Sequence, residues 1–325
     1  MVLKITISGG SLTYLVYLLG FEKVELLGQI KRFFSSHPIS IPKVVLLIVL
    51  MFVNWGAEVY KWKLLLQDMF PVTNRLAIKS TLAGVATAVF TPYRIGGYFG
   101  KVALLSFRYR AKGIVYQVYN AMALFLVNFF FGLLFLGLLG LEAKQEIIGL
   151  APDVFGMLAL IGSVLIIVIA VLYVNVNSVT VLFGKMPFTN KWMKAWKVLE
   201  GESYKKTALT VLSVSVIRYL VITYQYLLAF DIFGINADPL TIYFASGALF
   251  FLFQFVPVFN AVELGLTRTA MFTVILTTFG IVSEITPALT LAITTASFLI
   301  WVVNLAIPSI VGSLFLSQVK VLKEK

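Results

Sequence analysis

Residues 91–101 combine side chains that can bind an anion with residues that interrupt helices. The segment reads TPYRIGGYFGK, and long apolar stretches lie before and after it. Proline and glycine break helices, and a charged side chain between apolar stretches requires a polar environment. Irregular backbone at membrane depth persists only where protein or a water-filled cavity satisfies its polar groups. The segment is therefore the first candidate for a functional site.

The chemistry that these residue types favour is phosphate recognition. The guanidinium of Arg94 offers a planar fork of donors, and Lys101 adds a second cation. Gly96 and Gly97 let backbone amides approach an anion closely, and a helix that begins at Ile95 or Gly96 directs its positive end to the same place. The alternative is a shallow segment, in which Arg94 and Lys101 extend to the membrane interface and bind nothing specific.

A second broken segment, 257–268, carries a carboxylate. It reads PVFNAVELGLTR, and apolar runs flank it on both sides. An isolated carboxylate such as Glu263 is costly at membrane depth, so it must be paired, protonated or hydrated. Arg268, Arg94 and Lys101 are its possible partners. Two interpretations stay open: Glu263 coordinates a headgroup or controls a gate, or it forms a structural ion pair that joins two broken helices.

Polar residues inside apolar stretches give three smaller predictions. Arg218 lies about 11 residues inside an apolar stretch, too deep to reach the interface easily, so we expect a polar contact with a neighbouring helix or a cavity. Glu58 is followed by Lys61 at i+3, which favours a local ion pair near the interface. Asn304 precedes Pro308 by four positions, so its carbonyl loses its helical donor and a kink is expected.

These residues belong to a chain whose composition indicates an integral membrane protein. Of its 325 residues, 60% are hydrophobic and 12% are charged, and the mean hydropathy is +0.97. Such a chain has too little polar surface to cover a water-soluble globule. The absence of cysteine and the single histidine, His37, argue against disulfides, thiolate metal sites and histidine-based catalysis. No cofactor or metal is expected.

The net charge of +12 comes from cations in short connections between apolar runs. This placement favours orientation in a membrane and contact with anionic headgroups, and it argues against nucleic acid binding. The connection 176–206 and the C-terminal tail are rich in lysine, so both are predicted to be cytoplasmic in a plasma-membrane protein. Residues 141–153 and the turn near Asp231 and Asp238 are acidic and are predicted to face outward.

Apolar windows of about 20 residues predict an all-α, polytopic helix bundle, because that length crosses ~30 Å of hydrocarbon. No long polar linker divides the chain, so residues 1–325 are expected to form a single integral membrane domain. About eight spans are expected, and the first is interpreted as an uncleaved helix. Their approximate ranges are 4–20, 44–62, 114–140, 154–175, 207–230, 240–256, 262–282 and 287–316.

The region 76–107 has two interpretations. If 76–93 crosses the membrane, six cations face outward, against five if 76–107 enters and returns on the same side. This small difference does not decide between the two. The re-entrant or broken-helix hairpin is preferred, because Pro92, Gly96, Gly97 and Gly100 supply the break that it requires.

Four motifs resemble the transmembrane part of lysylphosphatidylglycerol synthases, a flippase-like membrane family whose members often occur without the soluble aminoacyl-transfer domain. They are NWGAEVYKWK at 54–63, TPYRIGGYFGK at 91–101, PVFNAVELGLTR at 257–268 and WVVNLAIPSIVG at 301–312, and RYLVITYQYLL at 218–228 is compatible. Relatives usually carry a glutamate where this chain has Gly97, and an arginine where it has Thr267. Arg268 follows one residue later, which on a helix rotates the cation by about 100°.

The resemblance and the charged residues together favour a lipid translocase-like protein. An anionic phospholipid headgroup is expected to enter a polar cavity while its acyl chains stay in the bilayer. The expected substrate-binding residues are Arg94, Gly96, Gly97, Lys101, Arg218, Glu263 and Arg268.

Two other functions stay open. The chain can be a non-transporting partner that positions a separate lipid-modifying or glycosyltransferase enzyme through the connection 176–206, or it can be a coupled solute transporter. A Walker A loop, a G-x-S-x-G nucleophile elbow and an H-E-x-x-H motif are all absent from the sequence, so no enzymatic activity is predicted.

Overall fold

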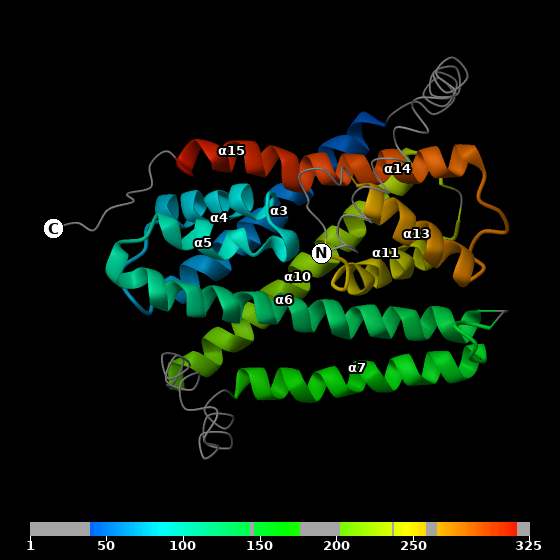
Figure 1. Cartoon of the computed structure of the whole chain (residues 1–325), viewed down its shortest axis with the longest axis horizontal. Coiled ribbons are helices and arrows are strands. Elements are labelled where there is room, and N and C mark those ends of the chain that lie inside the picture. Colours follow the sequence, from blue (N-terminus) through cyan, green and yellow to red (C-terminus); the bar gives the residue numbers. More distant parts are fainter. Residues whose placement is uncertain (1–39, 144–145, 176–201, 236, 258–264, 317–325) are drawn as a thin grey trace.

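The computed structural model describes residues 40–143, 146–175, 202–235, 237–257 and 265–316. Within these ranges, 83% of the residues are helical and no strand is present, which confirms the predicted all-α architecture. Five stretches of described helix are long and apolar enough to cross a membrane (Figure 1). They are α3 (Ile41–Leu66), α6 (Phe107–Glu142), α7 (Pro152–Val174), most of α10 (Glu202–Ile232) and the continuous stretch Pro287–Leu316.

The predicted number of about eight spans is not reached within the described residues. The first expected span, 4–20, lies outside them. The expected crossings 240–256 and 262–282 are instead the helices α11 (Pro239–Phe253) and α13 (Leu266–Thr278), which have 15 and 13 residues. At 1.5 Å per residue these helices are about 22 and 20 Å long, so each is shorter than the ~30 Å of hydrocarbon.

The region 76–107 forms a helical hairpin. Helix α4 (Asn74–Ala88) is followed by the short 3₁₀ helix η1 (Pro92–Arg94) and by α5 (Gly96–Ala103), which returns alongside α4. With 15 and 8 residues, both α4 and α5 are too short to cross ~30 Å. The structure therefore agrees with the re-entrant interpretation of this region and not with a full crossing by 76–93.

The tip of this first hairpin depends on local hydrogen bonds and unusual backbone angles. Tyr93 and Arg94 both have positive φ, 52° and 58°, a conformation that non-glycine residues rarely adopt. The backbone N–H of Gly96 donates to Oγ1 of Thr91 at 2.7 Å, and Oγ1 of Thr87 donates to the carbonyl of Gly96 at 2.8 Å. These bonds tie the start of α5 to the end of α4, so the reversal is held by the hairpin itself.

Close contact between α4 and α5 explains the glycines of the tip. A Cβ added at Gly97 would lie 3.1 Å from both the Cβ of Ala88 and the carbonyl oxygen of Gly84. A Cβ added at Gly100 would lie 2.8 Å from the carbonyl oxygen of Ala83. Because side chains are excluded here, the two helices pack backbone against backbone, as small residues allow between membrane helices.

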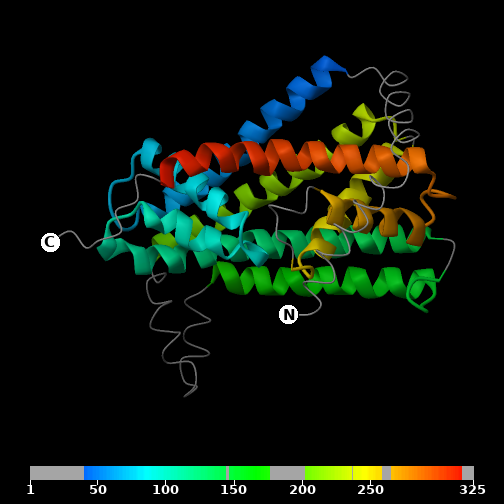
Figure 2. The same ribbon diagram turned by 45° about the horizontal axis from the view of Figure 1, so that its top comes forward.

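Helices α11 and α13 form a second hairpin at the other end of the bundle. Asp238 caps α11 by accepting hydrogen bonds from the backbone N–H and the hydroxyl of Thr241, at 2.8 and 2.9 Å, and these bonds lower the pKa of the Asp238 carboxyl. Gly265, with φ of 87°, precedes α13. In both views, α4 and α5 occupy one half of the bundle and α11 and α13 occupy the other (Figures 1 and 2).

The last span contains the predicted break. Helix α14 (Pro287–Trp301) continues through a π-helical segment, η3 (Val302–Ala306), into α15 (Ile307–Leu316). Pro308 has no N–H for the carbonyl of Asn304, and the N–H of Ile307 bonds to the carbonyl of Val302, five residues back. The break lies where α14 packs on α10 and α13 and where α15 begins to pack on α4.

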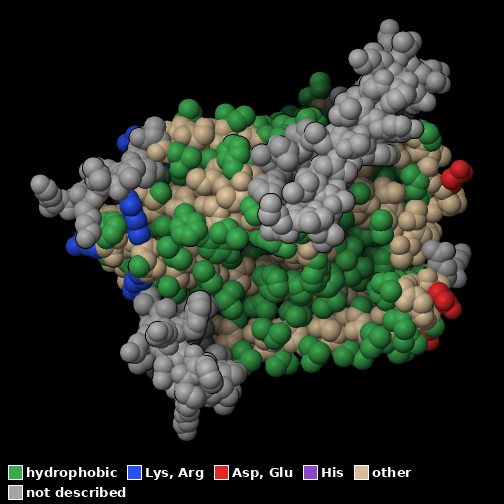
Figure 3. All heavy atoms as spheres, viewed as in Figure 1, with side chains coloured by type: hydrophobic (Ala, Val, Ile, Leu, Met, Phe, Trp, Pro, Cys, Tyr) green, Lys and Arg blue, Asp and Glu red, His purple; other side chains and the backbone are tan. Residues whose placement is uncertain are grey.

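Charge separates the two ends of the bundle, with an apolar surface between them (Figure 3). The basic end includes the start of α6, which carries Arg108, Arg110 and Lys112. The acidic end includes the turn between α6 and α7, and Lys43 pairs with Asp231 at 2.6 Å where α3 begins and α10 ends. The basic connection 176–206 lies almost wholly, and the tail 317–325 entirely, outside the described residues.

The surface between the two ends is suited to lipid. Helix α7 contacts α6 along one face and exposes aliphatic side chains on the other, where Met157, Leu158, Ile161, Val164 and Leu165 are each more than half exposed. A surface of this kind is stable in hydrocarbon and unstable in water. The observed fold therefore agrees with a membrane location.

Candidate functional site

One face of α3 begins the candidate site. Asn54, Glu58 and Lys61 lie at helical spacing i, i+4 and i+7, so they project from the same side of α3. All three side chains are buried in the bundle, and Lys61 is completely inaccessible. Charged side chains are rarely buried unless they are paired, so partners must come from other helices.

The carboxylate of Glu58 is the centre of a polar cluster built by four helices. Lys61 lies 3.2 Å away on the same helix, in the local pair that the sequence predicts. Lys101 from α5 and Arg218 from α10 also bind the carboxylate directly, one on each oxygen. Asn120 from α6 donates to the same carboxylate at 2.7 Å. Glu58 therefore links the first hairpin to three long helices.

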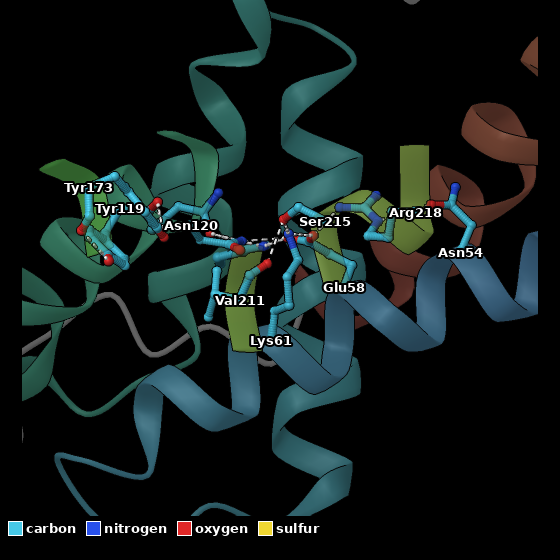
Figure 4. Close-up of polar contacts among 11 residues, drawn as sticks. Asn54, Glu58, Lys61, Tyr119, Asn120, Tyr173, Val211, Ser215 and Arg218 are labelled. Carbon is cyan, nitrogen blue, oxygen red and sulfur yellow. Dashed lines mark hydrogen bonds and ion pairs between the residues drawn. The ribbon is translucent and has the colours of Figure 1, made fainter. Parts of the chain in front are cut away.

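Neutral polar groups complete the cluster (Figure 4). Nε of Arg218 donates to Oδ1 of Asn54 at 2.9 Å, and Nδ2 of Asn54 donates to Oδ1 of Asn304 in η3 at 3.2 Å. Lys101 donates to Gln117 at 2.9 Å, and Lys61 donates to the hydroxyl of Ser215 at 2.9 Å. The network reaches from α6 to the π-helical break in the last span.

The charges of this cluster do not balance. Three cations, Lys61, Lys101 and Arg218, face one carboxylate, Glu58, and no other described carboxylate is within ion-pair distance of them. Two positive charges are therefore in excess in a region that the bundle shields from water. Unbalanced buried charge is strongly unfavourable, so this arrangement favours the binding of an anion.

Arg94 lies at the tip of the first hairpin and keeps an exposed side chain. Its charge is repelled by those of Arg268 and Arg218 and attracted by that of Glu58, so Arg94 lies within electrostatic range of the cluster. Among the described residues, no hydrogen bond or ion pair reaches the Arg94 side chain. Arg94 is therefore an available cation next to an already positive cluster.

Arg268 comes from the second hairpin. Its guanidinium lies over the ring of Phe253 in α11, 4.6 Å from the ring centre, and it is close enough to Arg94 for the two charges to repel. Although Arg268 lies one residue later than the arginine of the resembling motif, it still lies close to the first hairpin. Thr267, where relatives usually carry the arginine, is buried.

The other expected binding residues have different placements. Lys101 is 5% exposed and is held by Glu58 and Gln117, so it acts inside the cluster and not at the hairpin tip. The Cα positions of Gly96 and Gly97 face α4, so these glycines serve helix packing and not the close approach of an anion. Glu263 lies outside the described residues.

Several cluster residues were not among the candidates from the sequence. Gln117 and Asn120 lie in α6 and Ser215 lies in α10, all three are buried, and Glu58 was expected to form a local pair only. The spacing of Asn54, Glu58 and Lys61 within the motif NWGAEVYKWK was the available signal. Three polar residues on one face of a membrane helix indicate partners on a neighbouring helix.

The composition of the site favours an anion over a metal ion. Within the described ranges, no group of three or more histidine, cysteine, aspartate or glutamate side chains could hold a metal. Comparison of the chain with protein-family models, with curated proteins and with solved structures finds no match. The functional argument therefore depends on the geometry of this site.

Proposed function

We propose that the protein is a lipid translocase-like membrane protein that receives a negatively charged headgroup between its two hairpins. The observation that supports this proposal is the excess of cations at one place inside the bundle, where Lys61, Lys101 and Arg218 face a single carboxylate. A headgroup phosphate supplies the missing negative charge, and arginine binds phosphate through paired, charge-assisted hydrogen bonds.

The arrangement of the hairpins supports movement across the membrane. Each hairpin occupies one half of the bundle (Figures 1 and 2), and Arg94 of the first hairpin is within electrostatic range of Arg268 of the second. Paired broken helices that meet near the bilayer midplane are a common way for transporters to form a binding site. A headgroup held there has only a short distance to travel to either side, and its acyl chains stay in the bilayer.

The motifs at 54–63, 91–101 and 301–312, which resemble the flippase-like family, contribute residues to this one region. Asn54, Glu58 and Lys61 come from the first motif, Arg94 and Lys101 from the second, and the η3 break from the third. Since the motifs were identified separately, their convergence supports the family resemblance. We also infer a plasma-membrane location with the basic end in the cytoplasm, because positive connections remain on that side.

The proposal is tested by reconstitution in liposomes that contain fluorescent phospholipids. Wild-type protein is expected to accelerate the exchange of anionic lipids between leaflets, followed by chemical quenching of the outer leaflet. Arg94→Gln is expected to lower the rate by about tenfold, since loss of one charge-assisted contact is worth roughly 1.5 kcal/mol. The variant is expected to fold normally, because the Arg94 side chain has no partner among the described residues.

The matched control for this test is Arg108→Gln. It removes the same charge from an exposed position at the basic end, where Arg108 lies 4.5 Å from the ring centre of Tyr109. Its exchange rate is expected to equal that of the wild type. The proposal is wrong if the wild type does not accelerate exchange of any anionic lipid, or if the Arg94 and Arg108 variants behave alike.

A further inference from the structure

We propose that the ligand of this site carries a terminal phosphomonoester, a group with two negative charges, and not the singly charged phosphodiester of common phospholipids. The inference rests on the proposed function, because it names the headgroup class that the same site receives. It depends on two independent observations, the number of charges in the site and the hydrogen-bond donors that lack an acceptor.

The number of charges exceeds what a single negative charge can balance. Lys61, Lys101 and Arg218 surround Glu58, and Arg94 is within electrostatic range of Lys101, Arg218 and Glu58. These four cations against one carboxylate leave an excess of three positive charges before Arg268 is counted.

Three donor groups around the first hairpin lack an acceptor among the described residues. Arg218 uses Nε for Asn54 and Nη1 for Glu58, which leaves its Nη2 without a partner. The indole Nε1 of Trp55 is buried and donates to nothing, although its ring lies 5.7 Å from the guanidinium of Arg218. The guanidinium of Arg94 is the third group.

These donors lie near one another at the tip side of the cluster. Trp55 packs with Val85 and Val89, the residues of α4 and the adjoining turn that lead into the hairpin tip. Arg94 is in that tip and is repelled by the charge of Arg218. Of the three donors, Nε1 of Trp55 is buried, and a buried donor without an acceptor among the described residues costs free energy, so the site favours a ligand that accepts hydrogen bonds.

A phosphomonoester fits this combination. It has three terminal acceptor oxygens and a charge of about −1.5 to −2 near neutral pH. A phosphodiester has two such oxygens and one negative charge, so it leaves more of the positive charge uncompensated and one donor unpaired. The group can belong to a membrane lipid or to a soluble phosphate, because both present the same oxygens.

The test is an equilibrium competition experiment on the full chain in a neutral detergent, with radiolabelled phosphatidate as the bound probe. Unlabelled phosphatidate, which ends in a phosphomonoester, is expected to displace half of the probe at a concentration on the order of tenfold lower than phosphatidylglycerol, a phosphodiester with matched acyl chains. Equal competition by the two lipids, or tighter competition by phosphatidylglycerol, overturns the inference. Inorganic phosphate distinguishes the sources: weak competition assigns a lipid, and competition as strong as that of phosphatidate assigns a soluble phosphate.

Two variants show whether the named donors carry the preference. Trp55→Phe keeps an aromatic ring at this position and removes the indole N–H together with part of the ring system. It is expected to weaken the binding of phosphatidate several-fold and to change the binding of phosphatidylglycerol much less. Arg94→Gln is expected to remove most of the preference, and Arg108→Gln is expected to keep it. A preference that survives both Trp55→Phe and Arg94→Gln contradicts the assignment.

The outcome can be separated from that of the transport test. Lipid exchange in liposomes without any preference for phosphatidate in binding leaves the proposed function intact and rejects the phosphomonoester. Tight, selective binding of phosphatidate without exchange supports the headgroup class and rejects translocation.

Discussion

At the residue scale, the carboxylate of Glu58 holds three cations from three helices. Substitution by glutamine keeps the shape of the side chain but leaves Lys61, Lys101 and Arg218 without a counter-charge. Removal of one partner from a buried ion pair typically costs about 3–5 kcal/mol, because the other charge stays buried. Glu58→Gln is therefore expected to lower the free energy of unfolding by this amount, measured by denaturant-induced unfolding in detergent.

An exposed pair provides the control for Glu58. Asp231 lies 2.6 Å from Lys43, and its side chain is 55% exposed. Asp231→Asn is expected to change stability by less than about 1 kcal/mol, as for most surface ion pairs. The double variant Glu58→Gln with Lys101→Met removes one cation together with the carboxylate, and it is expected to recover part of the lost stability. Equal losses for Glu58→Gln and Asp231→Asn would contradict the central role of Glu58.

Gly97 offers a second test of a single position. The family that the motif resembles usually carries glutamate here, but in this chain a Cβ at Gly97 would lie 3.1 Å from both the Cβ of Ala88 and the carbonyl oxygen of Gly84, so a side chain would push α4 and α5 apart. Gly97→Glu is expected to destabilise the protein by about 1–3 kcal/mol, as for overpacked interiors. Thermal unfolding in detergent gives the measurement.

Gly56 is the matched control for Gly97. A Cβ added at Gly56 in α3 meets nothing within 4 Å. Gly56→Ala is expected to leave stability unchanged or to raise it by up to about 1 kcal/mol, because alanine is the better helix former. A stable Gly97→Glu variant would show that α4 and α5 can separate at this point.

The residues of the site could be predicted only in part from the sequence. Intramembrane charges such as Arg94, Lys101 and Arg218 are conspicuous, and so is the local pair of Glu58 with Lys61. The long-range partners could not be predicted, because Glu58 and Lys101 are 43 positions apart and Glu58 and Arg218 are 160 apart. Which cation reaches which carboxylate depends on helix packing, and single-sequence patterns do not encode that packing.

At the element scale, the first hairpin could be predicted and the second could not. Pro92 and three glycines mark the first break, and the structure has a hairpin there. In the region 240–282, the apolar stretches are long enough for two crossings, so hydropathy favoured two full spans. The actual helices, α11 and α13, end after 15 and 13 residues. Hydropathy measures how apolar a stretch is and does not show where its helix stops.

The two hairpins are expected to enter the membrane from opposite sides. This expectation can be tested with single cysteines, since the native chain has none. Single cysteines at Asn74 and Ser106 flank the first hairpin, and single cysteines at Ala237 and Ser283 flank the second. In intact cells or sealed vesicles, the first two are expected to react with a membrane-impermeant maleimide from one side and the last two from the other.

Glu146→Cys, in the turn between α6 and α7, serves as the reference for the acidic end. It is expected to react from the same side as Ala237→Cys and Ser283→Cys. Reaction of Asn74→Cys and Ser106→Cys from different sides would mean that the first hairpin crosses the membrane, which the lengths of α4 and α5 do not allow.

At the scale of the whole molecule, the polar cluster connects the first hairpin to the break in the last span. Glu58 joins α3 to the first hairpin through Lys101, and Asn54 joins the same helix to the break in the last span through Asn304. A change in the charge of the site therefore acts on the first hairpin and on the break in the last span together. This connection explains why the resembling motifs at 54–63, 91–101 and 301–312 lie far apart in the chain and still contribute to one place.

Because charge is separated between the ends of the bundle, the energy of the protein in a membrane potential depends on its orientation. Cations gather at one end and carboxylates at the other (Figure 3). A membrane potential changes the energy of each elementary charge moved across the bilayer by about 2.3 kcal/mol per 100 mV. A potential that is negative on the side of the basic end therefore stabilises this orientation, and inverted insertion becomes less favourable with every charge at either end.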